Sequence, residues 1–432
     1  MKQALTIGLA LAALQSFAQS EWTLLQCMQY AVEHNHEVRR TALELDNRLA
    51  SRTGAIGRFL PSLGANIGTQ YNFGRAINPE TNGYTDVNTF NNGYSLYASL
   101  PVFEGFGRIH ALKAAKAGTL MGRAALQRSR DLTALGVLEA ATEVAYYEGM
   151  TRMAAEKAQE TALLLRQTLL MEEVGRKSAA DVAQVESQQA EADYNLTYQQ
   201  NRYASALLEL KTRMGFPLND SLRPIIIPCA GEVAPRTGSG EEPAELQVAR
   251  YQMQVSRHEW RQARAALFPS LTLNVGANTA YYHTLHDDAG QAFRSQFKNN
   301  RGEYVGATLS IPLFNRLQTL TGIRRAKNNY HIACEHYEEK RQELEKLALE
   351  AWQEWQAYVK QTEQMRHKTQ ADSLAYQLTR RQFEEGLSTA VDLRTTSAQL
   401  LHSRATLLQC QLMAMVKEQF VRYYRGETIW TE

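Results

Sequence analysis

The chain has 432 residues, a formal net charge of +2 at pH 7 and 21% charged residues. Hydrophobic residues make up 44%, too many for a disordered chain and too few for a bundle of membrane-spanning helices. The near-neutral charge gives no electrostatic case for binding nucleic acid, so none is expected as a partner. The four cysteines lie far apart without CxxC spacing, which predicts unpaired thiols rather than a zinc site or disulfide framework.

The N-terminus has the three parts of a secretory signal peptide. A lysine at position 2 precedes an apolar run over Ala4–Leu14, and Ser16 and Ala18 supply small residues at a cleavage site. Residues 1–18 are therefore predicted to be removed and the mature chain exported. No later stretch approaches the ~20 apolar residues of a spanning helix, so a membrane crossing would have to use β-strands.

The ten prolines are unevenly spread. None occurs in residues 102–216 or after Pro312, which leaves two long stretches free of helix breakers. Five prolines fall within residues 217–243, a segment that also holds Gly238-Ser239-Gly240 and reads as a linker. Four others mark the expected ends of strands: Pro61, Pro101, Pro269 and Pro312. The remaining one, Pro79, lies in a polar loop.

The two halves of the chain resemble each other. Three segments recur in the same order at a nearly constant offset, which indicates an internal duplication. The pairs are Phe59–Leu63 with Leu267–Leu271, Ser99–Phe103 with Ser310–Phe314, and Gly175–Val182 with Gly386–Leu393. The predicted organisation is repeat 1 over residues 19–216, the linker over 217–243 and repeat 2 over 244–432.

Each repeat is predicted to begin with a helix. In repeat 1, Thr23 and Gln26 have the spacing of a capping box, and an amphipathic stretch runs from there towards Arg58. The counterpart begins near Pro243, a favourable residue at a helix start, and reaches about Leu267.

Two segments with the alternation of β-strands follow in each repeat. They are about as long as the 9 to 11 residues of a tilted membrane strand. The strands are expected over residues 63–73 and 94–100, and over 271–281 and 305–311, joined by polar loops at Arg75–Asn92 and His283–Gly302.

The pattern then changes to that of very long helices. Apolar residues such as Leu344, Leu347 and Ala351 recur at helical spacing among Glu and Lys. Helices are predicted over Gly107–Val174 and Asn315–Glu385, and the second would be about 105 Å long at 1.5 Å per residue.

Both long helices are expected to end at a glycine and to fold back into a second helix. Ser178 with Asp181, and Thr389 with Asp392, have the Ser/Thr-x-x-acid spacing of an N-terminal cap. The return helices should reach about Met214 and Tyr424. Each repeat thus predicts a helical hairpin with a tip at Gly175 or Gly386.

Four strands per chain cannot close a membrane barrel, and open strand edges are not tolerated in lipid. The sequence therefore predicts a membrane α+β fold in which several chains share one barrel. Two chains would give eight strands and three would give twelve.

On the duplicated strand anchors and duplicated tips, the sequence resembles the TolC outer-membrane efflux family over essentially its whole mature length. The opening Trp22–Leu24 and Ala31–Asn35 resemble members from Bacteroidetes-type bacteria. The resemblance implies a homotrimer in the outer membrane. Its twelve-stranded transmembrane β-barrel, with four strands per chain, would continue into a long periplasmic α-helical barrel. It also implies a passive exit duct that works with a periplasmic adaptor (membrane fusion) protein and an inner-membrane pump of the RND or ABC type.

The same resemblance places function at the hairpin tips. It assigns adaptor docking to Gly175, Ser178, Asp181, Gly386 and Thr389, and the tunnel aperture to Asp392. Family members can carry a further acid and a basic residue where Thr395 and Ser388 stand, so their gating ion pairs are not carried over. Capping is the simpler role of Asp181 and Asp392, and it is compatible with a place at the pore mouth.

Other functions find less support. The sequence shows no nucleophile–base pairing, phosphate loop or HExxH motif, so neither an enzyme nor a cofactor is expected. A metal could be held by His283, His286, Asp287 and Asp288, but a solvated polar loop is favoured.

The alternative function is a periplasmic helical scaffold or adaptor without a channel. The apolar alternation over Leu271–Tyr281 disfavours it, and a trimeric adhesin stalk fits the strand hairpins poorly.

Overall fold

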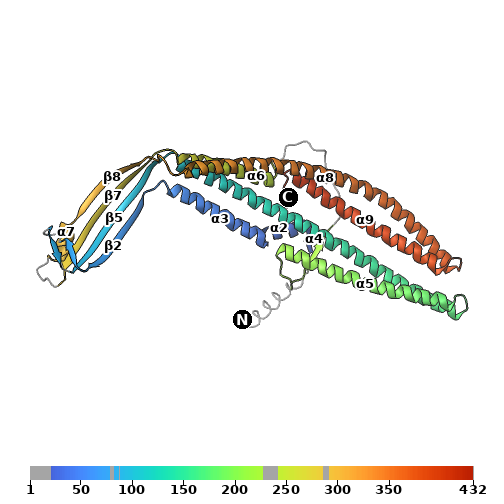
Figure 1. Ribbon diagram of the computed structural model, residues 1–432. Coiled ribbons are helices and arrows are strands. Elements are labelled where there is room, and N and C mark those ends of the chain that lie inside the picture. The colour runs from blue at the N-terminus through green and yellow to red at the C-terminus, as the bar shows by residue number, and fades with distance from the viewer. Residues whose placement is uncertain (1–20, 78–81, 87, 227–241, 286–290, 432) are drawn as a thin grey trace, which may run out of the picture. The chain divides into compact units, whose positions relative to one another are not determined.

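The computed structural model describes residues 21–77, 82–86, 88–226, 242–285 and 291–431 (Figure 1). The predicted signal peptide and most of the predicted linker lie outside these residues. The described chain falls into two compact units, one built from residues 45–122 and 249–338 and the other from the remaining segments. Both repeats contribute to both units.

One four-stranded antiparallel sheet contains the strands of both repeats. Its order is β2-β5-β7-β8, so the two hairpins pair through β5 and β7. The strands are β2 (Ser62–Asn72), β5 (Thr89–Glu104), β7 (Ser270–Thr284) and β8 (Gly302–Ser310). Within the described chain, β2 and β8 each have one edge without a strand partner.

The two faces of this sheet differ in polarity. The register places Leu63, Ile67, Leu96, Val275 and Val305 on one face. These side chains are exposed, Ile67 to 73% and Val305 to 80%. Small and polar residues such as glycine, serine and asparagine alternate with them on the opposite face. At these positions the apolar face therefore lacks a covering layer in the single chain.

The strand ends differ from the predicted ones. β5 is longer than expected at both ends. It begins at Thr89, inside the predicted loop, and it continues through Pro101, where a register shift between Pro101 and Phe103 accommodates a residue that cannot donate a ladder hydrogen bond. The prediction that Pro101 marks a strand end is wrong. The expected loops also contain structure: β3 (Arg75–Ile77) pairs with β4 (Tyr84–Asp86), and α7 (Phe293–Asn299) is a short helix.

The long helical hairpins are confirmed to within a few residues. The first hairpin is α4 (Gly107–Glu173) with α5 (Ala179–Met214), and the second is α8 (Gln318–Glu384) with α9 (Ala390–Tyr424). The two long helices each have 67 residues. Within the described residues, none of the helices combines the length and the apolar character needed to cross a bilayer.

The main core lies where four helices of one unit meet. It contains Cys27 from α2 (Leu24–His34), Leu138 from α4, Leu210 from α5 and Leu412 from α9, all at most 2% exposed. The α6 helix (Ala244–Ala265) opens repeat 2 near the predicted position.

The first predicted helix is divided by Asn35. Asn35 has an extended backbone, and α3 (His36–Gly57) begins immediately after it. The Asn35 side chain accepts a hydrogen bond from the Glu37 amide at 2.7 Å and donates one to the Arg213 carbonyl at 2.8 Å. These contacts offset the helical hydrogen bonds lost at the break, and the Thr23–Gln26 capping box forms as predicted.

A tight corner joins the sheet to α4. Gly105 has a φ of +57°, and a Cβ atom there would lie 2.5 Å from the Ala265 carbonyl oxygen and 2.7 Å from the Phe268 Cβ. Nearby, the Arg108 guanidinium donates to the Arg58 carbonyl at 3.0 Å. The corner thus depends on a residue without a side chain.

We expect Gly105→Ala to lower the free energy of unfolding by about 2 kcal/mol or more, because it combines an unfavourable φ with a backbone clash. The matched control is Gly54→Ala, which meets nothing within 4 Å and should raise stability by about 0.5–1 kcal/mol within its helix. Thermal unfolding of both variants in detergent measures the difference. Equal stability of the two variants would contradict the strained corner.

Candidate functional site at the helical hairpin tips

The first hairpin tip is a helix C-cap that only glycine fits comfortably. Gly175 has a φ of +73°. Its amide donates to the Glu172 carbonyl at 2.8 Å, and the Arg176 amide donates to the Met171 carbonyl at 2.8 Å. This pair of bonds is the Schellman motif, which closes a helix with a left-handed residue.

The second tip repeats this arrangement. Gly386 has a φ of +82°. The Gly386 amide donates to the Phe383 carbonyl at 3.1 Å, and the Leu387 amide donates to the Gln382 carbonyl at 2.7 Å. The duplication seen in the sequence is therefore a duplication of backbone geometry.

A capping box follows each glycine. The Ser178 hydroxyl accepts from the Asp181 amide at 3.2 Å, and the Asp181 carboxylate accepts from the Ser178 amide at 3.1 Å. The Thr389 hydroxyl and the Asp392 carboxylate make the same exchange, with both distances 3.1 Å. The capping role predicted for both acids is confirmed.

These hydrogen bonds also fix the charge of the two acids. Bonds from the Ser178 backbone and side chain lower the pKa of Asp181, and bonds from the Thr389 side chain and backbone lower the pKa of Asp392. A lowered pKa in the folded state stabilises the fold at pH values above the ordinary aspartate pKa, and that contribution is lost as the pH falls through the folded value. Both carboxylates are therefore ionised at neutral pH.

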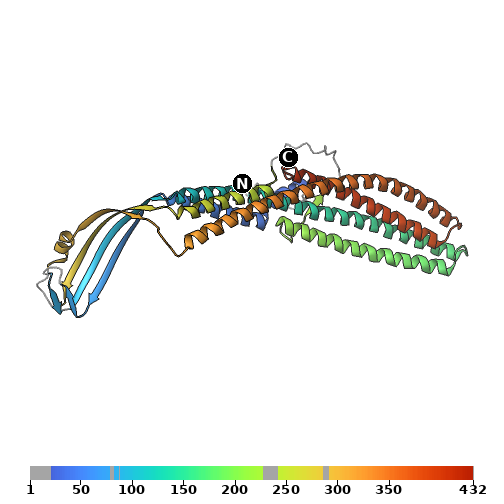
Figure 2. The same ribbon diagram turned by 45° about the horizontal axis from the view of Figure 1, so that its top comes forward.

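The two tips lie side by side at the same end of the helices (Figures 1 and 2). The Lys177 ammonium of the first tip is 3.8 Å from the centre of the Phe383 ring on α8, a cation–π contact. Phe383 is 2% exposed and belongs to a small core that also holds Val185 and Leu393. The six predicted tip residues thus form two matching groups on one packed end. Asp392 itself is exposed on the surface of the single chain.

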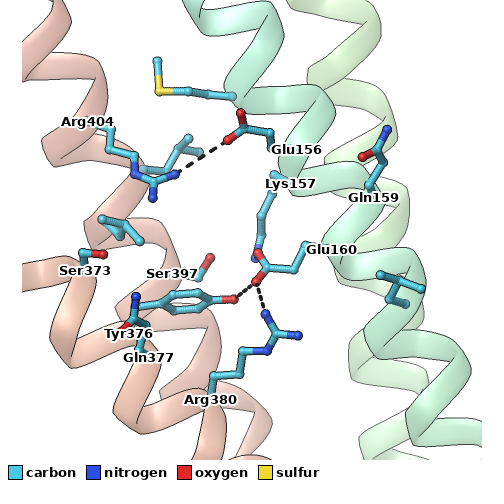
Figure 3. Close-up of a pocket in the computed structure, with 14 residues that line it drawn as sticks. Glu156, Lys157, Gln159, Glu160, Ser373, Tyr376, Gln377, Arg380, Ser397 and Arg404 are labelled. Carbon is cyan, nitrogen blue, oxygen red and sulfur yellow. Dashed lines mark hydrogen bonds and ion pairs between the residues drawn. The ribbon is translucent and has the colours of Figure 1, made fainter.

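A charged cavity of about 460 Å³ lies between α4, α8 and α9 in the same unit (Figure 3). At its centre the Glu160 carboxylate accepts a hydrogen bond from the Tyr376 hydroxyl and lies 3.2 Å from the Arg380 guanidinium. Burial and the Glu160 hydrogen bond raise the pKa of Tyr376, so the phenol stays protonated and donates. A second ion pair, 3.8 Å between Arg404 and Glu156, borders the cavity.

The sequence did not reveal this cluster. Its members come from positions of α4, α8 and α9 that are far apart in the chain, and charged residues are frequent on all exposed helix faces. Only the spacing of Tyr376 and Arg380, one helical turn apart, shows in the sequence that they share a face. The pairing with Glu160 arises from the tertiary packing.

Most of the residues considered for a metal site lie outside the described part of the chain. His283 is the last residue but one of β7, whereas His286, Asp287 and Asp288 lie outside the described residues. Across the residues that the structure does describe, no three side chains of the kinds that ligate metals come together.

We expect Ser178→Ala to weaken the start of α5 by about 1 kcal/mol, because it removes the acceptor for the Asp181 amide. Hydrogen exchange followed by mass spectrometry should show faster exchange in the first turn of α5. Ser187→Ala is the matched control, since Ser187 is an exposed residue further along the same helix. Unchanged exchange at the tip in Ser178→Ala would show that the box does not hold the turn.

Comparison with known proteins matches two long segments of the chain to one family. The family model described as outer membrane efflux protein matches residues 27–215 and 241–419. Among curated proteins, none is significantly similar in sequence.

Solved structures of outer-membrane proteins share the fold. The outer membrane protein VceC from Vibrio cholerae is 15% identical, with a TM-score of 0.81 over 94% of this chain and 96% of that one. CusC is 16% identical, with a TM-score of 0.83 over 95% and 96%. The CmeC outer membrane channel of Campylobacter jejuni is 14% identical, with a TM-score of 0.82 over 93% and 85%.

The family match covers most of both repeats and excludes only the ends and the region of the linker. The resemblance to TolC-type proteins that the duplicated anchors and tips carry is thereby confirmed. The chain belongs to the outer membrane efflux protein family.

Proposed function

We propose that the protein is the outer-membrane exit duct of a tripartite efflux or secretion system. As a homotrimer, it would conduct small molecules or peptides passively from the periplasm to the exterior. The observation that carries the proposal is the sheet. Among the described residues, one sheet of four strands has an exposed apolar face and two outer edges without a strand partner, and it is continuous with helices of 67 residues.

Further copies of the chain are needed to close the sheet in a lipid bilayer. An apolar face needs lipid or a core, and strand edges in lipid must be paired. Two copies would make eight strands, a barrel whose interior side chains fill, whereas twelve strands leave room for a lumen. A conducting duct therefore favours three copies, with the polar face of the sheet lining the passage.

The helical hairpins would continue the wall of the duct into the periplasm. Their paired tips, with Gly175, Ser178 and Asp181 on one and Gly386 and Thr389 on the other, are proposed to dock a periplasmic adaptor protein. The adaptor would connect the duct to an inner-membrane pump of the RND or ABC type. The ion pairs of Arg380 with Glu160 and of Arg404 with Glu156 join α4 to α8 and to α9 in the same unit as the tips.

Membrane fractionation separates this function from a soluble periplasmic scaffold. The duct should remain in the outer-membrane fraction after washing with concentrated salt and should require detergent for release. Release by salt alone would favour the scaffold, because only peripheral contacts would then hold the protein.

The aperture role of Asp392 has a separate test. In a trimer, three exposed carboxylates at the tips would attract multivalent cations, so Asp392→Asn should raise the blocking concentration of such a cation roughly tenfold in planar bilayers. Asparagine retains an acceptor for the Thr389 amide, so the cap is preserved. Asp181→Asn is the matched control and should change the block less. An unchanged block in Asp392→Asn would remove this residue from the aperture.

A further inference from the structure

The α7 helix covers the part of the β7 edge that β8 does not reach. Pairing of β7 with β8 stops at Asn278, opposite Gly302. Beyond that level the Gln296 side chain, 4% exposed, accepts from the Tyr282 amide at 2.9 Å and donates to the Tyr282 carbonyl at 2.8 Å. Asn300 donates to the Ala280 carbonyl at 2.7 Å. Side-chain amides thus replace the missing strand.

The same helix rests on the apolar face of the sheet. The Phe297 ring lies 5.3 Å from the ring of Tyr94, and the Phe293 ring lies 5.2 Å from that of Tyr281. The Thr279 hydroxyl donates to the Phe297 carbonyl at 2.8 Å. Even so, Phe293 and Phe297 remain 47% and 42% exposed. The exposed sides of these two rings therefore extend the exposed apolar face of the sheet.

A basic stripe flanks the two phenylalanines. Arg294 and Lys298 each follow a phenylalanine by one residue and are exposed. At about 100° per residue they form a stripe beside the aromatic one, on the side away from Gln296. Arg301, the next basic residue, is paired with Glu303 and is not part of this stripe.

We propose that α7 is an interfacial anchor at which Arg294 and Lys298 bind the phosphate groups of an anionic lipid in the outer leaflet. This proposal rests on the proposed function, which places the sheet in the outer membrane. The helix lies at the end of the sheet opposite the corner at Gly105, where α4 begins (Figure 1), so that placement puts it at the external boundary of the bilayer.

The chemistry of α7 matches that boundary. Aromatic rings are enriched where barrels cross the membrane surface, and lysine and arginine extend their charged groups towards lipid headgroups while their stems contact apolar surface. Interfacial helices combine an apolar face that carries aromatic residues with a face rich in lysine and arginine, and α7 has both. Gln296 and Asn300 hold the helix in register on β7, so both stripes are fixed relative to the sheet.

The test uses the purified mature protein in neutral detergent, with thermal unfolding as the readout. Lipid A carrying two phosphates should raise the unfolding temperature of the wild type, whereas neutral phosphatidylcholine should not. In the variant Arg294→Gln with Lys298→Gln, the lipid A concentration for half-maximal stabilisation should rise at least tenfold. The matched control is Arg324→Gln with Lys327→Gln, which removes two exposed basic residues from α8 and should keep the wild-type response.

Equal stabilisation of both double variants by lipid A would overturn the proposal. Stabilisation by inorganic phosphate at the same concentration would also overturn it, because the site would then take a free anion rather than a lipid. Circular dichroism and the oligomeric mass of each variant confirm that it is folded. Fractionation tests the proposed function separately: a wild-type protein that stays in the outer membrane but is not stabilised by lipid A refutes only the anchor.

Discussion

Backbone groups on a strand edge cannot be left unpaired in lipid, and the rest of this structure depends on that constraint. The chain places four strands in one sheet and leaves one edge of β2 and one edge of β8 without a strand partner among the described residues. Further copies of the chain can supply both partners at once, because β2 and β8 lie at opposite edges. On the part of the β7 edge that β8 does not reach, the side chains of Gln296 and Asn300 donate hydrogen bonds to the backbone in place of a strand.

Duplication makes this sheet continuous across the repeats. β5 of repeat 1 pairs with β7 of repeat 2 over the whole length of both strands. On the polar face, the Tyr97 ring lies over Gly64 and the Tyr304 ring lies over Gly276, each tyrosine directly opposite its glycine in the register. The two hairpins thus repeat a cross-strand contact in the same way that the two tips repeat a cap.

Features determined by local sequence could be predicted. The capping boxes at Ser178 and Thr389, and the tip glycines, depend on residues within a few positions of each other, and they form as expected. Long helices and strands of alternating polarity are likewise local patterns. The order β2-β5-β7-β8 was not predictable in this way, because the pairing of β5 with β7 joins residues from different repeats.

The features that the sequence did not reveal are tertiary. The break at Asn35 interrupts an amphipathic pattern that continues on both sides, and it depends on a contact with the distant Arg213 carbonyl. The α7 helix is too short for a clear helical period, and its position depends on the unpaired edge of β7. For the candidate site, the tip residues were predictable but the Glu160 cluster was not, because its partners meet only after three helices pack.

The mass of the intact, detergent-solubilised mature protein, measured by native mass spectrometry, tests the shared barrel most directly. A barrel completed by three copies of the chain predicts one stable species of three chains. A protein that is monomeric under conditions that preserve its strands would contradict the shared barrel, because four strands alone leave both edges open.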